Sequence, residues 1–321
     1  MSIYEVYKRY RAAYKNYIGV MWNLYRNKKI IEVILKDGTH EKFSPDIAFM
    51  ISDLLVRKGA DFTKVNEVIR KEKSTLEGFS VIDFDNLLDH GVMDFSEIKA
   101  AMKNIMEYRR NERILYKNNT IVMHGLKEVG DIFGVFMAED YKWLNVENEI
   151  VVDIGAQNGD SAIYFALNGA KKVIAIEPQP YSFDFAIRNV KENGLEKVIE
   201  LLNAGYGKDR VVSIDENYKG MDLRVSKEGK PLKLYTLENL VQKFNLGTAV
   251  LKMDCEGCEY NMLNEKNSTL ARFSQMKIEY HRGYKRLVGK LRDAGFNVEW
   301  STHHRVETVG FIYASKPRNL L

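Results

Sequence analysis

Hydrophobic positions follow their clearest pattern between residues 150 and 178. A short apolar run ends at Asp153, glycines follow at Gly155 and Gly159, and apolar residues then recur at helical spacing. A second apolar run ends at Glu177. This succession of strand, glycine turn, helix and strand predicts one βαβ unit of a parallel sheet, with an acidic residue at the end of each strand.

The same alternation of strand and helix patterns continues to the end of the chain. Further strands are predicted at residues 197–202, 248–253, 274–280, 296–301 and 306–314. Helices are predicted at residues 181–193, 236–243 and 284–294, and a turn-rich hairpin at residues 211–230. Since the last two strands are close enough along the chain to pair, the pattern predicts an α/β fold with five parallel strands and a terminal antiparallel pair.

The N-terminal third has a different pattern, with helices and short hairpins in place of βαβ units. Hairpins are predicted at residues 30–43, turning at Asp37-Gly38, and at residues 113–124, turning at Asn118-Asn119. Helices are predicted at residues 2–27, 45–57, 62–73 and 95–112. We therefore expect a mainly helical α+β region at residues 1–112, which contacts the substrate or another subunit, and an α/β domain at residues 113–321.

The first predicted helix has tyrosines on one face and basic residues on the other. Only Glu5 balances the basic residues Lys8, Arg9, Arg11, Lys15, Arg26, Lys28 and Lys29. Such a helix can pack on the body of the protein or on a partner subunit, giving a homo-oligomer. It can also serve as a nucleic-acid arm or as an anchor on an anionic membrane surface. Packing is favoured, because tyrosine inserts into lipid less readily than leucine or phenylalanine.

Composition is that of an ordinary soluble globular protein. Of the 321 residues, 29% are charged and 45% are hydrophobic, and a net charge of +4 is too small to indicate nucleic-acid binding by itself. Two cysteines give no disulfide framework and favour a reducing interior. The sequence shows no signal peptide and no stretch apolar enough to span a membrane. We expect a cytoplasmic protein.

The turn after the first parallel strand predicts a site for an adenosine-type cofactor. Gly155 and Gly159 let the backbone approach a ligand closely, and the amides that open the next helix favour a carboxylate or phosphate. Glu177, at the end of the next strand, can accept hydrogen bonds from both hydroxyls of a ribose. Gln157 occupies the place of the second glycine in a dinucleotide-binding motif, which disfavours a dinucleotide.

A second motif, LKMDCEGCE at residues 251–259, makes a resemblance to a known family specific. Together with DIGAQNGD at 153–160, AIEPQP at 175–180 and IEYH at 278–281, it resembles the FkbM family of methyltransferases. The resemblance implies a Rossmann-like, seven-stranded class I methyltransferase sheet and S-adenosylmethionine as cofactor. It also implies methyl transfer to a hydroxyl of a sugar, glycan or small metabolite. Cysteines at positions 255 and 258 depart from the family pattern, which has small or apolar residues there.

The resemblance also implies which residues form the site. Those expected to hold S-adenosylmethionine are Asp153, Gly155, Ala156, Gln157, Asn158, Gly159, Ser161, Glu177, Pro178, Asn203, Ala204 and Asp254. Among these, Glu177 is expected at the ribose, and Asn203 with Ala204 beside the adenine. Asp254, Glu256 and His281 are expected to face the acceptor.

An alcohol acceptor needs a base, because its own proton is held too tightly at neutral pH. Carboxyl ends of parallel strands meet in one crevice, so Asp254, Glu256, Glu259, Glu279 and His281 are expected to lie close together. Such crowding raises at least one carboxyl pKa and provides a base, with His281 as the other candidate. No metal site is predicted from spacing, although the same acids could hold a divalent metal that orients a diol.

Less specific interpretations stay open beside these. Asp254 and Glu256 could simply cap the following helix, where acids are favoured. Cys255 and Cys258 are expected to be two small buried thiols, in preference to a metal or redox pair. His303 and His304 fall in a predicted turn and are expected to be solvated.

Two other functions also remain open. One is an RNA 2′-O-methyltransferase that uses Asp254, Glu279 and either Lys252 or Lys277, with the basic first helix as an RNA arm. The other is a non-catalytic module that binds S-adenosylmethionine. An enzyme that methylates exocyclic amines is disfavoured, because the fourth strand lacks the N/D-P-P-Y/F motif.

Overall fold

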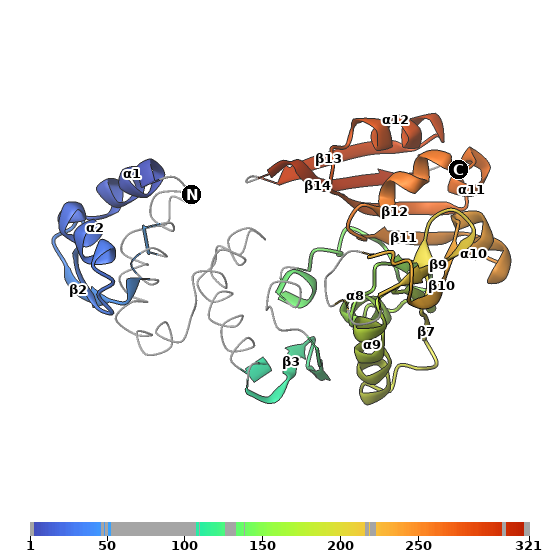
Figure 1. The fold of residues 1–321 in the computed structure, drawn as a ribbon, viewed down its shortest axis with the longest axis horizontal. Helices are drawn as coiled ribbons and strands as arrows, with labels where there is room; N and C mark the ends of the chain where they lie inside the picture. The colour runs from blue at the N-terminus through green and yellow to red at the C-terminus, as the bar shows by residue number, and fades with distance from the viewer. Residues whose placement is uncertain are drawn as a thin grey trace. The chain divides into compact units, whose positions relative to one another are not determined.

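A computed structural model describes residues 3–45, 48, 51–52, 107–108, 110–125, 133–137, 139–215, 218, 223–303 and 306–317. The chain divides into two compact units (Figure 1), formed by residues 1–111 with 128–138 and by residues 112–127 with 139–321. The predicted helices at 45–57, 62–73 and 95–112 lie wholly or largely outside the described residues. Among the described helices, none is both long and apolar enough to cross a membrane.

In the first unit, the single helix predicted over residues 2–27 is wrong, because the structure has two helices there. They are α1 (Ile3–Ala13) and α2 (Tyr17–Tyr25). Between them the Lys15 amide donates a hydrogen bond to the Ile34 carbonyl, and the Asn16 side chain accepts one from the Ile34 amide, 2.7 Å away. These bonds to a neighbouring strand end the first helix, although the periodicity of side chains continues through the break.

The strand that receives these bonds belongs to the first predicted hairpin, which is confirmed. Strands β1 (Ile31–Ile34) and β2 (His40–Phe43) pair antiparallel, with Gly38 in the turn at a φ of 98°. A π-helical turn, η1 (Phe133–Met137), also belongs to this unit.

The second unit begins with the other predicted hairpin, formed by β3 (Arg113–Tyr116) and β4 (Asn119–Val122). Its turn lies one residue earlier than predicted, at Lys117-Asn118, where φ is 46° and 65°. Both central residues of such a two-residue turn need positive φ, and asparagine adopts that conformation more readily than most residues.

The fold class is confirmed by a seven-stranded sheet in the second unit. Its strands are β5 (Ile150–Ile154), β6 (Lys172–Ile176), β7 (Ile199–Leu202), β11 (Ala249–Met253), β12 (Phe273–Tyr280), β13 (Asn297–His303) and β14 (Val306–Ser315). Their order is β13-β14-β12-β11-β5-β6-β7. Five strands run parallel, and β14 pairs antiparallel with both β12 and β13.

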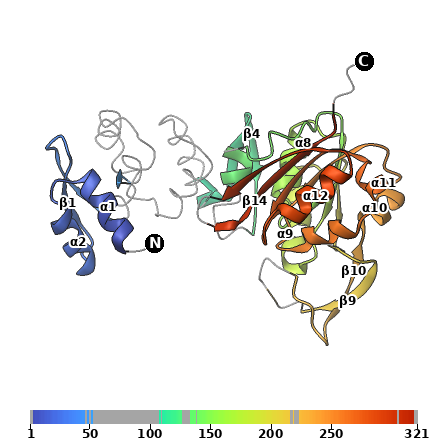
Figure 2. The same cartoon turned by 90° about the horizontal axis from the view of Figure 1, so that it is seen from above.

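Helices pack on the sheet around central strands that are almost entirely buried (Figure 2). They are α8 (Asp160–Leu167), α9 (Pro180–Glu192), α10 (Leu237–Lys243), α11 (Asn267–Leu270) and α12 (Lys285–Asp293). One core cluster joins apolar residues of β5, β6, β11 and β12 to those of α10, α11 and α12. The central strands are continuous apolar runs in the sequence, without alternation, because both faces of the sheet are covered.

A smaller sheet follows β7 along the chain. It consists of β8 (Gly205–Tyr206), β9 (Arg210–Ile214) and β10 (Lys230–Tyr235), in the order β8-β10-β9. The hairpin predicted at residues 211–230 corresponds to the antiparallel pair of β9 and β10. It belongs to this separate sheet, since β10 also pairs with β8.

Candidate functional site

The turn between β5 and α8 is held by close backbone contacts that require glycine. Gly155 has a φ of +78°, and a Cβ atom there would meet the carbonyl oxygen of Asp254 at 1.7 Å. The amides of Gly155 and Ala156 both donate to the carbonyl of Ile176, at 3.0 and 3.1 Å. Gly159, with a φ of 86°, is the N-cap of α8. The turn therefore joins the carboxyl ends of β5, β6 and β11.

Asp153 lies beneath this turn and is fully buried. Its carboxylate accepts a hydrogen bond from the Ser161 hydroxyl at 2.6 Å and forms an ion pair with Lys252 at 3.1 Å. The Lys252 amine also donates to the Gly155 carbonyl at 2.6 Å. Burial lowers the pKa of Lys252, but the charges of Asp153 and other nearby acids outweigh it and raise that pKa. Asp153 and Ser161 are thus engaged with each other and with a lysine that anchors the turn.

Glu177 follows β6 and is 5% exposed. Its two carboxyl oxygens accept hydrogen bonds from the backbone amides of Gln157 and Gln179, at 2.9 and 2.8 Å. Burial nevertheless raises the pKa of Glu177 from 4.5 to about 7. Each oxygen keeps a further lone pair, so the fixed carboxyl group can accept two more hydrogen bonds.

Of the other residues predicted to hold the cofactor, Asn203 and Ala204 follow β7, and Asn158 lies in the turn between β5 and α8. The Asn203 side chain donates to the carbonyls of Glu177 and Pro178, at 2.9 and 3.2 Å, and so joins the ends of β6 and β7. Ala204 is buried in the core cluster. The Asn158 side chain donates away from the turn, to the His124 carbonyl at 3.0 Å. Asn158 and Asn203 therefore hold protein backbone through their amide groups.

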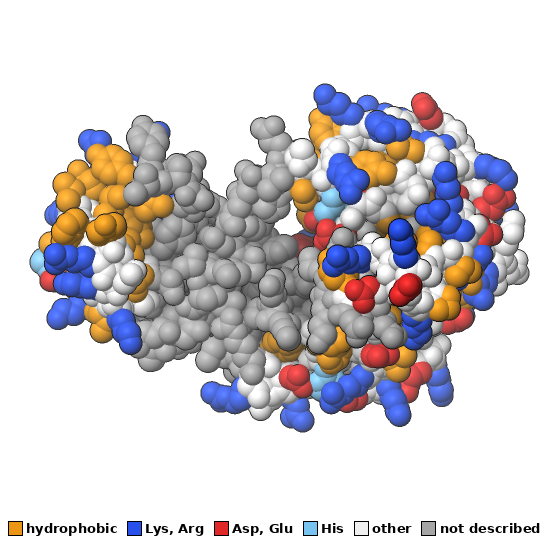
Figure 3. All heavy atoms as spheres, in the orientation of Figure 1, with side chains coloured by type: hydrophobic (Ala, Val, Ile, Leu, Met, Phe, Trp, Pro, Cys, Tyr) orange, Lys and Arg blue, Asp and Glu red, His pale blue; other side chains and the backbone are white. Residues whose placement is uncertain are grey.

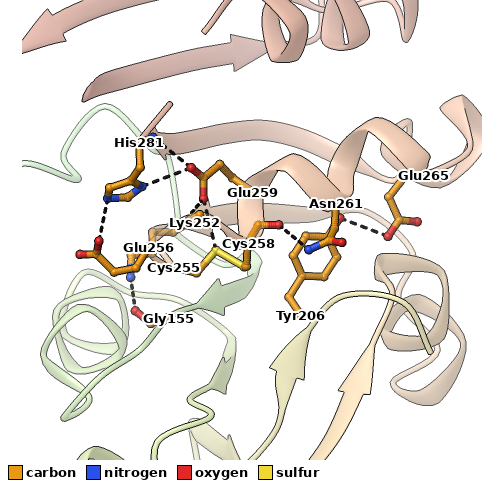
Figure 4. The surroundings of a disulfide bond; sticks show 11 residues. Gly155, Tyr206, Lys252, Cys255, Glu256, Cys258, Glu259, Asn261, Glu265 and His281 are labelled. Atoms are coloured by element: carbon orange, nitrogen blue, oxygen red, sulfur yellow. Dashed lines mark hydrogen bonds and ion pairs between the residues drawn. A yellow bond between two sulfur atoms is a disulfide. The ribbon is translucent and has the colours of Figure 1, made fainter. Parts of the chain in front are cut away.

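The segment after β11 differs from the sequence prediction. Cys255 and Cys258 form a disulfide bond (Figure 4), so the expectation of two free thiols is wrong. Positive φ values at Glu256 (55°) and Gly257 (109°) fold the chain back and bring the two Cα atoms to 5.4 Å, within the normal range for a disulfide. The bond closes a loop between β11 and the 3-10 helix η2 (Cys258–Asn264). Disulfides are rare in the cytosol, so a cytoplasmic location stays a prediction.

Asp254 and Glu279 lie together at the ends of β11 and β12. A hydrogen bond links the two carboxyl groups, and burial together with the charge of Asp254 raises the pKa of Glu279 far above its usual value. Two adjacent carboxylates cannot both ionise without a compensating charge. Glu279 therefore retains its proton at neutral pH.

His281 lies between two further carboxyl groups, as Figure 4 shows. Its Nδ1 atom is 3.2 Å from the carboxylate of Glu259, and its Nε2 atom is 3.4 Å from that of Glu256. Glu259 is fully buried and also accepts hydrogen bonds from the amides of His281 and Gly257, at 3.0 and 2.8 Å. Burial lowers the pKa of His281, but Glu259, Glu256 and Asp254 outweigh it, so that pKa is raised.

The cluster can serve either proton transfer or cation binding. Ligand atoms of Asp254, Glu279 and His281 all lie within 4.8 Å of one another, a spacing that a divalent cation could bridge. The same three groups can instead exchange protons with an acceptor hydroxyl. The structure thus brings together the acids and the histidine that the sequence assigned to the acceptor.

Three residues contribute more to the site than the sequence suggested. Glu259 fixes His281, and the buried Lys252 anchors the glycine turn. Tyr141 lies close to one lysine of β11 and one of β12, its ring 5.7 Å from the Lys252 amine and 5.0 Å from that of Lys277. The repeated acids of LKMDCEGCE pointed to Glu259, but no sequence signal places Tyr141 against β11 and β12.

Part of the chain matches the model of a known protein family. Residues 153–298 match the family model described as Methyltransferase FkbM domain. Over 100 residues the chain is 31% identical to the tRNA(Phe) (4-demethylwyosine(37)-C(7)) aminocarboxypropyltransferase of Pyrococcus horikoshii, covering 28% of this chain and 36% of that protein. It is also 28% identical over 141 residues to uncharacterized protein 158B of Sulfolobus islandicus rod-shaped virus 1, covering 44% of this chain and 66% of that protein.

These matches leave much of each relative uncovered, since the chain spans 36% and 66% of their lengths. Among solved structures, methyltransferase FkbM from Methylobacillus flagellatus KT matches with a TM-score of 0.40 and 14% identity. That match covers 78% of this chain and 60% of the other.

Proposed function

We propose that this chain is an S-adenosylmethionine-dependent O-methyltransferase, on the premise that residues 153–298 match the Methyltransferase FkbM domain, the family that the motifs resemble. The acceptor is a hydroxyl group of a sugar, a glycan or another small metabolite. One observation carries the proposal. A histidine and several carboxyl groups gather at the ends of β11 and β12, against the glycine turn that ends β5.

The residues near the turn fit S-adenosylmethionine. Glu177 presents a carboxyl group whose orientation two backbone amides fix, which suits the adjacent hydroxyls of a ribose. Lys252 and Asp153 hold the turn from below through buried bonds, so the turn needs little rearrangement when a ligand binds. When bound, S-adenosylmethionine supplies an electrophilic methyl group.

On the acceptor side, His281 is the proposed base. A proton on Nδ1 is directed to Glu259, which leaves Nε2 to take the proton of the acceptor hydroxyl. Glu256 lies beside Nε2 and stabilises the imidazolium that results. Asp254 is held against the glycine turn, and the raised pKa of Glu279 beside it keeps a proton on Glu279 that can be donated to another oxygen of the acceptor.

The RNA alternative is less well supported by the contacts of its two lysines. Lys252 and Lys277 are 2% and 3% exposed. Lys252 bonds to Asp153 and to the Gly155 carbonyl, and Lys277 donates to the carbonyl of Asp140. Lysines committed in this way are poorly placed to activate a ribose hydroxyl of RNA.

Calorimetric titration with S-adenosylmethionine, and separately with NADH, tests the cofactor. We expect binding of S-adenosylmethionine alone, weakened roughly tenfold or more by Glu177→Ala, since two hydrogen bonds to the ribose are lost. The matched control is Glu196→Ala, which removes an exposed acid from the same domain. Preference for NADH, or equal affinity of the two variants, contradicts the proposal. Acceptor screening then starts with sugars.

A further inference from the structure

The first unit carries an exposed apolar surface that methyl transfer does not use. Four large hydrophobic side chains of α2 and the segment after it are exposed: Ile18 is 68% exposed, Trp22 55%, Tyr25 81% and Ile30 64%. The first three are spaced four and three residues apart in α2 and so share one face of that helix, and Ile30 follows it closely. We call these four residues the α2 surface. The rings of Trp22 and Tyr25 stack with their centroids 5.9 Å apart.

Basic residues outnumber acidic ones along the chain around the α2 surface. No acidic residue occurs between Glu5 and Glu32. Arg26 lies over the Trp22 ring, 5.0 Å from its centroid. The other exposed basic residues of this stretch are Lys8, Arg11, Lys15, Lys28 and Lys29. Figure 3 shows hydrophobic side chains gathered at the α1–α2 end of the first unit, with Lys and Arg side chains beside them.

We propose that the α2 surface docks on an anionic membrane surface. Tryptophan and tyrosine favour the boundary between water and lipid, and the two isoleucines supply apolar area for the acyl region. The surrounding lysines and arginines are attracted to anionic headgroups. No residue of α2 itself is charged, so the helix can lie in the plane of the interface. This inference does not depend on the proposed methyl transfer.

The structure removes the objection that tyrosine inserts poorly into lipid. Tyr10 and Tyr14, which contributed to the tyrosine stripe, are 1% and 0% exposed and belong to the core of the first unit. The exposed side chains of the α2 surface are mainly isoleucine and tryptophan, which suit lipid better than the buried tyrosines do. The break between α1 and α2 is what separates the buried tyrosines from the exposed face.

Two other occupants fit the surface less well. A second copy of the chain would bring another group of cations against this one, and like charges across an interface are unfavourable. Single-stranded RNA would use the cations and the stacked rings. Ile18 and Ile30, however, offer an RNA neither charge nor an aromatic face.

Fluorescence of Trp22 in the full chain tests whether α2 enters the membrane interface. The chain has three tryptophans, so Trp143→Phe with Trp300→Phe leaves Trp22 as the single reporter. We expect its emission to shift to shorter wavelength with vesicles of phosphatidylcholine and phosphatidylglycerol, and brominated lipids to quench it. Vesicles of phosphatidylcholine alone are expected to have a weaker effect, because they lack the anionic headgroups.

Cosedimentation with the same vesicles tests the contributions of charge and apolar area. Lys28→Gln with Lys29→Gln is expected to weaken binding roughly 30-fold, because each basic residue near an anionic surface contributes about a factor of five. Lys227→Gln with Lys230→Gln makes the same charge change on exposed residues of the second unit and is expected to have no effect. Ile18→Ser is expected to weaken binding roughly tenfold. Ile187→Ser, at an exposed site in α9, is its control.

Each outcome decides the proposal. Vesicle binding that both charge variants weaken equally overturns it, because attraction would then follow net charge alone. An unshifted Trp22 spectrum also overturns it, as does concentration-dependent self-association that Ile18→Ser abolishes in the absence of lipid. Retention of RNA without vesicle binding assigns the surface to RNA and likewise ends the proposal.

Discussion

Two groups of acidic residues lie at the carboxyl ends of neighbouring strands, and they differ in how their charge is balanced. At the ends of β5 and β6, Asp153 is paired with Lys252, and Glu177 accepts hydrogen bonds from two backbone amides. At the ends of β11 and β12, Glu279 keeps a proton beside Asp254 and His281 lies between two more carboxyl groups. The first group holds a fixed geometry, whereas the second holds protons.

The strand register explains much of this difference. Lys252 of β11 lies opposite Asp153 of β5 on one side and Lys277 of β12 on the other. Lys252 turns to Asp153 and the glycine turn, and Lys277 donates to a loop carbonyl at Asp140. At the ends of β11 and β12, His281 lies between the carboxyl groups of Glu256 and Glu259. We infer that the same sheet supplies a rigid cofactor half and an acceptor half that can move protons.

Replacing His281 should give the largest change in the acceptor half. We expect His281→Gln to lower kcat by about 100- to 10,000-fold, the usual contribution of a general base. In the parent enzyme kcat should fall as pH drops through the pKa of His281, because only the unprotonated ring accepts a proton. Since its acidic neighbours raise that pKa, the fall should occur above the ordinary histidine range. The measurement is a pH–rate profile with an identified acceptor.

Glu259→Gln tests the effect of Glu259 on His281 while the His281 ring itself stays in place. Loss of the buried charge should move the fall in kcat to lower pH, because the carboxylate of Glu259 is a main cause of the raised pKa of His281. A nuclear magnetic resonance titration of the His281 ring nitrogens checks the same shift without any acceptor. If neither His281→Gln nor Glu259→Gln changes the pH–rate profile, and metal chelation abolishes activity, the results would favour a cation held by Asp254, Glu279 and His281.

Replacing Lys252 should give the largest change in the cofactor half, measured as stability. Lys252→Met leaves the buried carboxylate of Asp153 without its partner and should reduce the free energy of unfolding by about 3–5 kcal/mol. Lys172→Met, which removes an exposed ion pair with Glu200, should cost at most about 1 kcal/mol. Urea denaturation of both variants compares them. Equal losses would show that the cofactor half is not held by this ion pair.

The sequence predicted the parts of this arrangement that depend on local pattern. Apolar runs located every strand of the large sheet, and the order of acids at strand ends placed Asp153, Glu177 and Asp254 at one edge of it. Turn chemistry located both hairpins, since Asp37-Gly38 and the adjacent asparagines favour tight turns. These features are fixed by residues that are close in sequence.

The sequence did not predict features that depend on contacts beyond the local pattern. The first helix ends near Tyr14 because β1 competes for its backbone, and helical periodicity carries no sign of that competition. The disulfide forms because positive φ at Glu256 and Gly257 folds the loop back, whereas composition alone suggested two thiols. Tyr141 lies against lysines of two strands that are far away in sequence. Whether the site residues act as proposed stays a prediction.

The smallest expected effect concerns the pH dependence of cofactor binding, which should originate in Glu177 of the cofactor half and not in the acceptor half. Burial raises the pKa of Glu177 to about 7, and only its ionised form can accept hydrogen bonds from two ribose hydroxyls. Affinity for S-adenosylmethionine should therefore rise with pH and level off above about 7, falling by at most tenfold per pH unit below that value. Titration calorimetry across this range measures it. Glu177→Gln should bind more weakly with no such dependence, while His281→Gln should keep the dependence of the parent. A dependence lost in His281→Gln instead would mean that the acceptor half, and not Glu177, controls cofactor binding.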